Sequence, residues 1–324
     1  MERAAVIERT GGPEVIGWRE VALPPPGAGE VRMRHTAVGL NYIDTYHRSG
    51  LYPMALPGGL GSEAAGLVEA VGEGVTDLRP GDLVATFGPS RGAYATARNL
   101  PAAELFALPD DVDDRTAAAV LLKGCTAEFL VERCARVEAG HAVLVWAAAG
   151  GVGQILVGWL KRVGATVIAV VGTDAKAVRV RELGADHVLL HRREDVAARV
   201  REITAGAGVD VSLDSVGQAS WDASLASVRP RGLLVSYGNA GGPVTAVNLG
   251  VLAARGSLFV TRPTLFDYYR DPAERAAGVE RLWAMLREGA VRPEIGRTFP
   301  LADAAEAHRA LEAGETRGST VLIP

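Results

Sequence analysis

The sequence predicts a two-domain α/β protein in which a doubly wound parallel sheet is inserted into an antiparallel, barrel-like module. Its length of 324 residues corresponds to about two domains of roughly 150 residues each. Residues 1–120 carry short strand-like segments between Gly- and Pro-rich turns, which is typical of antiparallel strands. Between residues 120 and 262, apolar strands alternate with helical patterns, which indicates βαβ units and a parallel sheet.

The first 120 residues predict the strands of the antiparallel module. Turn residues such as Pro24–Gly27 and Arg79–Gly81 interrupt them, because Pro and Gly favour tight turns. The segments with strand-like composition are Ala4–Ile7, Val31–Arg34, Ala65–Val71 and Asp82–Phe87.

The middle of the chain predicts a six-stranded parallel sheet. Its apolar segments recur about every 20 residues with helical patterns between them, and such crossovers are almost always right-handed. A doubly wound sheet follows from that regular alternation. The predicted strands are Ala142–Trp146, Thr166–Val170, His187–Leu190, Val209–Leu213, Leu233–Tyr237 and Ser257–Val260, with the last at the sheet edge.

The C-terminal tail is predicted to return to the first module. Apolar residues at helical spacing indicate helices over Pro272–Glu288 and Leu301–Leu311, and Thr320–Ile323 reads as a closing strand. We therefore expect residues 1–120 and 265–324 to form one domain and residues 121–264 the other.

Composition excludes several functional classes. A formal net charge of −4 gives no basic footprint for nucleic acid, so no nucleic-acid partner is expected. The apolar run Val143–Val157 contains glycines and is too short to span a bilayer. Two cysteines build no disulfide framework, and the first ten residues are too charged for a signal peptide. These features predict a cytoplasmic protein without a membrane partner.

A glycine-rich loop predicts a dinucleotide-binding site. The segment Trp146–Gly153 follows a predicted strand and opens the predicted helix Val152–Arg162, with the spacing Ala148-x-Gly150-x-x-Gly153. Glycines allow the backbone to approach a diphosphate, and the helix N-terminus supplies free N–H groups. The alternative is a cluster of packing glycines with no ligand. The contacts predicted in this loop are Ala149, Gly150, Gly151 and Val152.

The end of the second strand favours NADPH over NADH. An NAD site usually places a carboxylate there, whereas this chain has Val171 and Gly172. Lys176 follows one turn later, and Arg192 with its neighbour Arg193 follows the adjacent strand, so cations are available for a 2′-phosphate. Asp174 is expected to cap the helix that follows, and the alternative for Lys176 is an ordinary solvated charge. The contacts predicted here are Gly172, Thr173, Lys176 and Arg192.

Nearly the whole chain resembles the zinc-free medium-chain dehydrogenase/reductases, in particular the NADPH:quinone oxidoreductases related to zeta-crystallin. The resemblance implies a GroES-like catalytic domain, a Rossmann domain and NADPH in a cleft between them. The motifs that carry it are Gly11–Val15, Gly39–Asp44, Arg48–Pro53, Gly61–Gly66, Leu122–Gly124, Ala147–Gly153, Asp214–Gly217 and Val260–Pro263.

The resemblance also implies contacts to the cofactor beyond the glycine loop. His191 stands where relatives tend to carry a Tyr at the 2′-phosphate end, and an imidazole there makes the contact sensitive to pH. The alternative is that His191 is an ordinary surface residue. The remaining implied contacts are Asn41 and Asp44 near the nicotinamide, Lys123 and Thr126 close to the cofactor, and Ser215, Tyr237 and Asn239 along its length.

No metal is expected. Zinc-dependent branches of the superfamily carry a Cys where this chain reads Leu40–Tyr42 and a Gly-His-Glu where it reads Gly61–Glu63. The chain has two cysteines and six scattered histidines, which form no tetrahedral set. Without a Lewis acid to polarise an alcohol, the favoured substrate is one that accepts electrons readily, such as a quinone or an activated alkene.

The segment after Asn41 supplies candidate catalytic residues. Tyr46 and Tyr52 can stack on a planar quinone or donate a hydrogen bond to its developing oxyanion, the alternative being packing aromatics. The predicted function is NADPH-dependent quinone reduction. Reduction of α,β-unsaturated carbonyls, as by an enoyl or 2-alkenal reductase, is the alternative, and a non-catalytic RNA-binding or structural role is a third. Exposed sheet edges are usually covered, and the resemblance implies a homodimer through the edge strand Ser257–Val260.

Overall fold

The computed structural model describes residues 1–324, which divide into two compact units. The first unit is Met1–Leu122 with Pro293–Pro324, and the second is Lys123–Arg292. Residues 265–292, which sequence analysis assigned to the catalytic domain, therefore lie in the second unit.

Direct packing explains why residues 265–292 lie in the second unit. The Tyr269 hydroxyl donates to a carboxylate oxygen of Glu128 at 2.6 Å. A side chain at Gly124 would overlap Leu282, so the helix that carries Leu282 packs closely against the one that carries Gly124. Sequence periodicity detects such a helix but does not show which neighbour it packs on.

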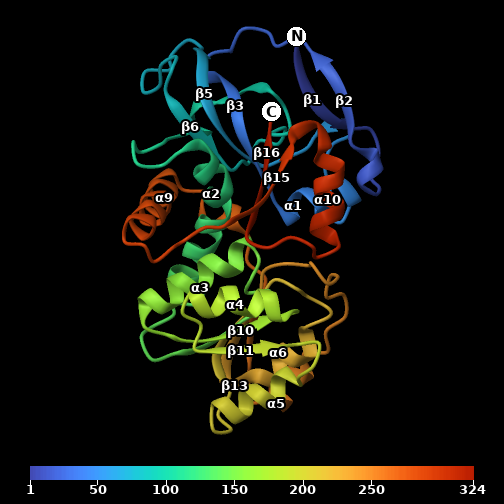
Figure 1. The fold of residues 1–324 in the computed structure, drawn as a ribbon, viewed down its shortest axis with the longest axis vertical. Helices are drawn as coiled ribbons and strands as arrows, with labels where there is room; N and C mark the ends of the chain where they lie inside the picture. Colours follow the sequence, from blue (N-terminus) through green and yellow to red (C-terminus); the bar gives the residue numbers. More distant parts are fainter. The chain divides into compact units, whose positions relative to one another are not determined.

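The first unit is built on antiparallel strands, as predicted (Figure 1). Its larger sheet has the order β15-β16-β3-β5-β6-β8 with β7 paired to β3, and only the β15–β16 pair is parallel. The smaller sheet has the order β2-β1-β4. The strands are β1 (Glu2–Ile7), β2 (Gly17–Val21), β3 (Glu30–Leu40), β4 (Gly58–Gly59), β5 (Glu63–Val71), β6 (Leu83–Thr86), β7 (Ala97–Pro101), β8 (Phe106–Ala107), β15 (Ile295–Pro300) and β16 (Ser319–Ile323).

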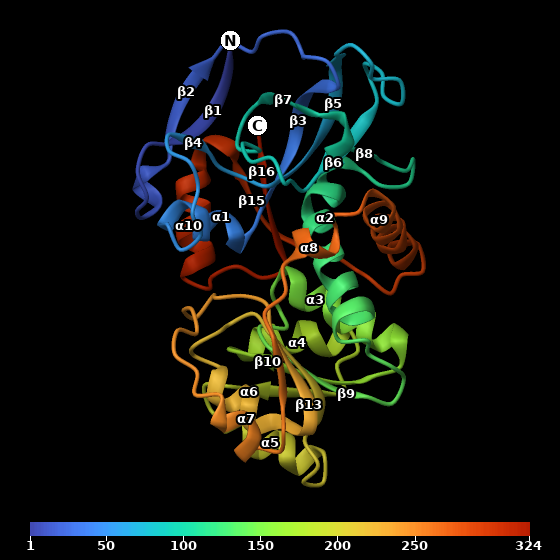
Figure 2. The same cartoon turned by 180° about the vertical axis from the view of Figure 1, so that it is seen from behind.

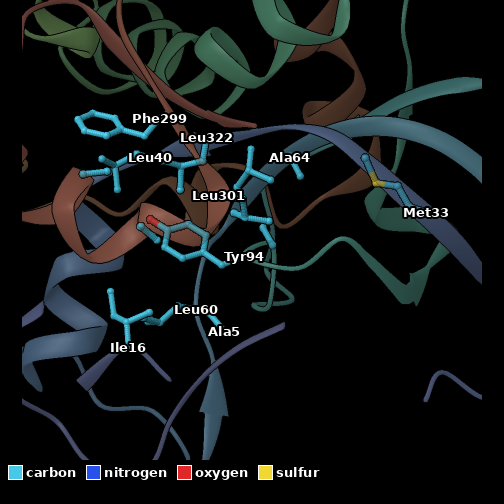
Figure 3. Close-up of a cluster of buried hydrophobic side chains, with 14 of the residues drawn as sticks. Ala5, Ile16, Met33, Leu40, Leu60, Ala64, Tyr94, Phe299, Leu301 and Leu322 are labelled. Atoms are coloured by element: carbon cyan, nitrogen blue, oxygen red, sulfur yellow. The ribbon is translucent and has the colours of Figure 1, made fainter. Parts of the chain in front are cut away.

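The C-terminal tail completes the core of the first unit. Leu322 of β16 and Leu301 lie in the same buried cluster as Leu40, Leu60 and Tyr94 (Figure 3). Residues 293–324 therefore return to the first unit, whereas residues 265–292 do not. Two helices of this unit concern the site, α1 (Tyr42–Ser49) and α10 (Ala304–Glu312).

The second unit contains the predicted six-stranded parallel sheet. Its order is β11-β10-β9-β12-β13-β14, the arrangement of a doubly wound Rossmann sheet. All five pairings are parallel, and β14 lies at the edge as predicted. The strands are β9 (Ala142–Val145), β10 (Thr166–Val171), β11 (His187–Leu190), β12 (Val209–Asp214), β13 (Val228–Ser236) and β14 (Phe259–Thr261).

Helices cover both faces of the parallel sheet. Figures 1 and 2 show α3 (Gly151–Val163) and α4 (Asp174–Glu182) on one face and α5 (Val196–Ile203) and α6 (Trp221–Ser227) on the other. None of the helices combines the length and apolar character needed to cross a bilayer. The remaining helices are α2 (Asp114–Glu128), which continues into a π-helical segment (Phe129–Cys134), α7 (Gly250–Ala254), α8 (Leu265–Tyr268) and α9 (Pro272–Arg287).

Candidate active site

The predicted contacts of the second unit gather at one edge of the parallel sheet. Parallel strands end at the same edge, which is where ligands of doubly wound folds bind. The candidates are Ala149, Gly150, Gly151 and Val152 after β9; Gly172, Thr173 and Lys176 after β10; His191 and Arg192 after β11; Ser215 after β12; and Tyr237 and Asn239 after β13.

The glycine loop leaves the first turn of α3 open. Gly150 is the N-cap residue and has no side chain that could cap the N–H groups of that turn. These donors and the helix dipole are suited to a diphosphate. Gly153 has a different role, because a side chain there would overlap the carbonyl oxygen of Ala147. Gly153 therefore serves packing, whereas Gly150 leaves room for close approach to a ligand.

Two basic side chains lie beside Gly172, and a third, Lys176, lies close enough for its charge to act on His191. A Cβ atom at Gly172 would lie 3.1 Å from His191 Nε2 and 3.6 Å from Arg192 Nε. Burial and then the Arg192 charge lower the pKa of Lys176. Burial lowers the pKa of His191 as well, followed by the charges of Arg192 and Lys176. Cations that disfavour each other's charge in this way are suited to a bound anion.

The turn after β10 corrects one prediction. Thr173 caps α4, because its Oγ1 accepts a hydrogen bond from the Lys176 N–H at 3.3 Å. Asp174 is the first residue of α4 and pairs with Arg193 at 2.8 Å, so its predicted capping role is wrong. Thr and Asp both favour the N-cap position, so the sequence alone does not show which of Thr173 and Asp174 caps the helix.

The loops after β12 and β13 approach each other closely. A side chain at Gly238 would overlap the carbonyl oxygen of Ser215. The buried Asp214 carboxylate holds the first loop, accepting from the N–H groups of Val216 at 2.8 Å and Gly217 at 3.0 Å. Sequence analysis named Ser215 but missed Asp214 as its support. An Asp that ends a buried strand and precedes Ser-Val-Gly was the available signal.

Asn41 and Asp44 direct their polar atoms into the first unit. Asn41 Nδ2 donates to Glu63 Oε2 at 2.8 Å, and its backbone N–H donates to Asp44 Oδ2 at 3.0 Å. Asp44 also accepts from Ser62 Oγ at 3.0 Å and Tyr94 Oη at 3.2 Å. Asn41 is 5% exposed and Asp44 is 1% exposed. These bonds cap α1 and fix where it begins.

The network continues through side chains that sequence analysis did not single out. Arg48 donates to His308 Nδ1 at 3.1 Å and pairs with Glu312 at 2.6 Å. Since arginine only donates, His308 carries its proton on Nε2 and donates it to Tyr94 Oη at 2.9 Å. Burial, with Arg48 adding to it, lowers the pKa of His308 to about 3. The hydrogen bonds therefore run in one direction, from Arg48 to Asp44.

The candidate catalytic tyrosines lie on α1 and just after it. The rings of Tyr46 and Tyr52 are 5.1 Å apart at an interplanar angle of 61°, and His47 lies 5.9 Å from Tyr52. Tyr46 is 9% exposed, whereas Tyr52 is half-buried. The Tyr42 hydroxyl donates to the Leu311 carbonyl at 3.1 Å, which anchors that ring in the fold. Tyr52 thus presents the more accessible of the two candidate rings.

Lys123 and Thr126 are three residues apart on α2 and share a face of that helix. Lys123 is 5% exposed, and Thr126 is half-buried. Glu63, which holds Asn41, also accepts from the Leu122 N–H at 2.7 Å. One buried carboxylate therefore fixes both the start of α1 and the turn of α2 directly before Lys123.

The structure contains no cluster of three or more His, Cys, Asp or Glu side chains arranged to hold a metal ion. Its two cysteines, Cys125 and Cys134, are free thiols. Catalysis without zinc stays a prediction from the sequence.

Comparison with known proteins places this architecture in a family. Residues 27–110 match the family described as alcohol dehydrogenase GroES-like domain, and residues 183–322 match the one described as zinc-binding dehydrogenase. A quinone oxidoreductase from Pseudomonas aeruginosa is 48% identical over 97% of both chains. A 2-haloacrylate reductase from a Burkholderia species is 44% identical over 100% of this chain and 99% of that protein.

A solved structure agrees with both halves of the fold. Escherichia coli quinone oxidoreductase in complex with NADPH superposes with a TM-score of 0.97 at 41% identity, covering 99% of this chain and 100% of that one. The protein belongs to the medium-chain dehydrogenase/reductase superfamily and, within it, to the quinone oxidoreductase family. It is an oxidoreductase, and the predicted GroES-like and Rossmann folds are confirmed.

Proposed function

We propose that the protein is an NADPH-dependent reductase of quinones. The observation that carries the cofactor choice is that His191 and Arg192 lie beside Gly172, with Lys176 close enough to interact with both, at the position where an NAD site usually holds a carboxylate. The substrate class comes from the quinone oxidoreductases that match nearly the whole chain.

The residues of the second unit fit the parts of NADPH. The open N-terminus of α3 with Gly150 and Gly151 holds the diphosphate. Lys176 and Arg192 pair with the 2′-phosphate, because charge-assisted hydrogen bonds to phosphate are strong. When bound, NADPH supplies the hydride for the reduction. The other proposed contacts are Ala149, Val152, Thr173 and His191, then Ser215, Tyr237 and Asn239 along the cofactor, with Lys123 and Thr126 toward its nicotinamide end. Asn41 and Asp44 are buried in the first unit, so their proposed role is to position α1 rather than to contact the cofactor.

The residues proposed to bind the quinone belong to the first unit. Tyr52, and Tyr46 behind it, offer a ring face on which a planar quinone stacks, and the Tyr52 hydroxyl donates to the oxygen that gains negative charge. Asn41 and Asp44 act on this surface by fixing the start of α1. The final proton comes from water.

Reduction of an activated alkene is the second candidate. The observation that favours it is the 2-haloacrylate reductase at 44% identity, close to the 48% of the quinone oxidoreductase. An alkene conjugated to a carbonyl also develops negative charge on oxygen when it accepts a hydride, so the same tyrosines would serve it.

We also propose that the protein is a cytoplasmic homodimer. Strand β14 lies at the open edge of the parallel sheet, and its Phe259 is 62% exposed. Pairing with the same edge of a second copy would bury that ring and complete the strand's hydrogen bonds. A monomeric mass in solution at micromolar concentration would contradict the dimer.

One assay separates the two substrate classes. NADPH oxidation is followed with an ortho-quinone and, in parallel, with a 2-alkenal, and NADH replaces NADPH in the controls. Turnover of the quinone with a preference for NADPH is expected. Turnover of the alkenal alone would establish the second candidate, and no turnover of either would refute both.

A further inference from the structure

We propose that His191 is a proton-dependent third cation of the 2′-phosphate site, so that discrimination between NADPH and NADH increases as the pH falls through neutrality. The inference rests on the proposed use of NADPH. It adds that the pH sets the strength of the preference for NADPH over NADH, through the protonation of His191.

The position of His191 carries the first step. Its Nε2 atom would lie 3.1 Å from a Cβ at Gly172, so the ring nitrogen faces the small space that the glycine leaves open. Arg192 reaches the same space from the next residue, with Nε at 3.6 Å from that Cβ. The His191 side chain is exposed, so a ligand can reach it. An imidazole in this position can donate to a phosphate oxygen.

Burial, followed by the charges of Arg192 and Lys176, lowers the pKa of His191 before a ligand binds. Neighbouring cations disfavour the imidazolium, and the carboxylates nearby are occupied: Asp174 pairs with Arg193 at 2.8 Å, and Glu194 accepts from the Leu190 N–H at 2.7 Å. The neutral ring of Trp146, the residue directly after β9, lies 6.5 Å away. The charges that act on the imidazole are those of Arg192 and Lys176. The other charged residues of the segments next to it are Asp174 of α4 and Arg193 and Glu194 of the loop after β11.

Binding of the 2′-phosphate reverses this balance. A phosphate monoester carries close to two negative charges at neutral pH and offsets the two neighbouring cations. The imidazolium is then favoured, so His191 takes up a proton when the phosphate binds. NADH has no 2′-phosphate and produces no such uptake. Proton uptake linked to one ligand makes the affinity for that ligand rise as the pH falls.

The phosphate itself titrates near pH 6 and works in the opposite direction, because a cationic site prefers its dianion. The experiment therefore compares the protein with His191→Gln, which keeps the phosphate titration and a hydrogen-bond donor but cannot take up a proton. The matched control is His187→Gln, which replaces an exposed histidine at the start of the same strand, β11.

Calorimetric titrations with NADP⁺ and NAD⁺ at pH 6.5, 7.25 and 8, at constant ionic strength, measure both affinities. Buffers with different ionisation enthalpies count the protons exchanged. In the unmodified protein and in His187→Gln, the ratio of NADP⁺ to NAD⁺ affinity is expected to rise several-fold, to at most about tenfold per unit of pKa shift, as the pH falls. In His191→Gln this rise disappears, and net proton uptake with NADP⁺ falls.

The outcomes separate the two proposals. If NADP⁺ binds no more tightly than NAD⁺ at every pH, the proposed cofactor is wrong. If NADP⁺ is preferred, but His191→Gln shows the same pH dependence and the same proton count as the unmodified protein, the cofactor stands and the role of His191 is overturned. Equal effects of His187→Gln and His191→Gln would overturn it as well.

Discussion

The amide of Asn41 donates from Nδ2 to the fully buried carboxylate of Glu63 at 2.8 Å. The other oxygen of that carboxylate accepts from the Leu122 N–H at 2.7 Å. Gly39 lies so close to this carboxylate that a side chain there would overlap it. Glu63 is thus a buried acceptor that joins two segments. One is the start of α1 at Asn41, and the other is the turn of α2 directly before Lys123.

Exchanging the amide of Asn41 and the carboxylate of Glu63 between the two positions tests this arrangement. Asn41→Asp would place two carboxylates together in the core and should cost about 3–5 kcal/mol of unfolding free energy. Glu63→Gln leaves one buried N–H facing another and should cost about 1–3 kcal/mol. In the double variant, the amide nitrogen introduced by Glu63→Gln can donate to the carboxylate introduced by Asn41→Asp, and the amide oxygen can accept from the Leu122 N–H. Part of the lost stability should therefore be regained.

Urea unfolding of the four proteins measures the coupling between the two substitutions. We expect the double variant to be about 1–3 kcal/mol more stable than the sum of the single losses predicts. Strictly additive losses would show that the two side chains do not depend on each other.

The glycine loop separates a packing residue from a ligand-facing one. Gly153→Ala forces a methyl group against the Ala147 carbonyl and should destabilise the fold by about 1–3 kcal/mol. In Gly150→Ala, the only atom near the new methyl group is the carbonyl oxygen of Ala147, at 3.3 Å, so the fold should tolerate the substitution. The same methyl should weaken NADPH and NADH binding equally, because both carry the diphosphate. Thermal unfolding and cofactor titration check these outcomes, and unchanged binding by Gly150→Ala would favour a purely structural loop.

Removing a cation at the 2′-phosphate site should affect NADPH selectively. Lys176→Ala or Arg192→Ala is expected to weaken NADPH binding about 10- to 100-fold, the equivalent of one charge-assisted hydrogen bond, and to leave NADH binding nearly unchanged. Arg193→Ala is the matched control because Arg193 is paired with Asp174. An equal loss in the control would indicate a general effect of charge rather than contact with the phosphate.

The parallel sheet was predictable because buried parallel strands are continuous apolar runs at regular intervals. The glycine loop could be placed from the strand before it and the helix after it. Contacts distant in the sequence could not be predicted in this way. Arg48 and His308 are 260 positions apart, and no local pattern joins them. Asn41 and Asp44 were named through a family resemblance, whereas their inward hydrogen bonds became visible only in the structure.

Buried histidines should make the protein sensitive to acid. Burial lowers the pKa of His308 and that of His35 to about 3, with nearby arginines adding to both shifts. The unfolded chain binds these protons near pH 6.5 and the folded protein does not, so stability is lost as the pH falls from about 6.5 toward 3.

Replacing one of these histidines isolates its share of the acid sensitivity. His308→Gln keeps a donor for Tyr94, loses the acceptor for Arg48 and is less stable at pH 7. Its unfolding free energy should fall less steeply between pH 6 and 4, by up to about 1.4 kcal/mol per pH unit. Denaturant unfolding at several pH values measures the slope, with His187→Gln as the exposed control. An unchanged slope in His308→Gln would mean that His308 does not titrate on unfolding.

The hydroxyl of Tyr52 is expected to act on the rate rather than on the fold. If it donates to the oxygen that becomes negative, Tyr52→Phe lowers kcat about 10- to 100-fold and leaves KM for the quinone nearly unchanged, because the ring still stacks. Tyr52→Leu removes the ring and should raise KM as well. In Tyr42→Phe, by contrast, only the bond to the Leu311 carbonyl is lost, so stability falls by about 1 kcal/mol while kcat stays the same. Steady-state kinetics with one quinone, together with thermal unfolding of all three variants, distinguishes these effects. A Tyr52→Phe variant with the original kcat would show that Tyr52 only stacks on the quinone and donates no hydrogen bond that matters to the rate.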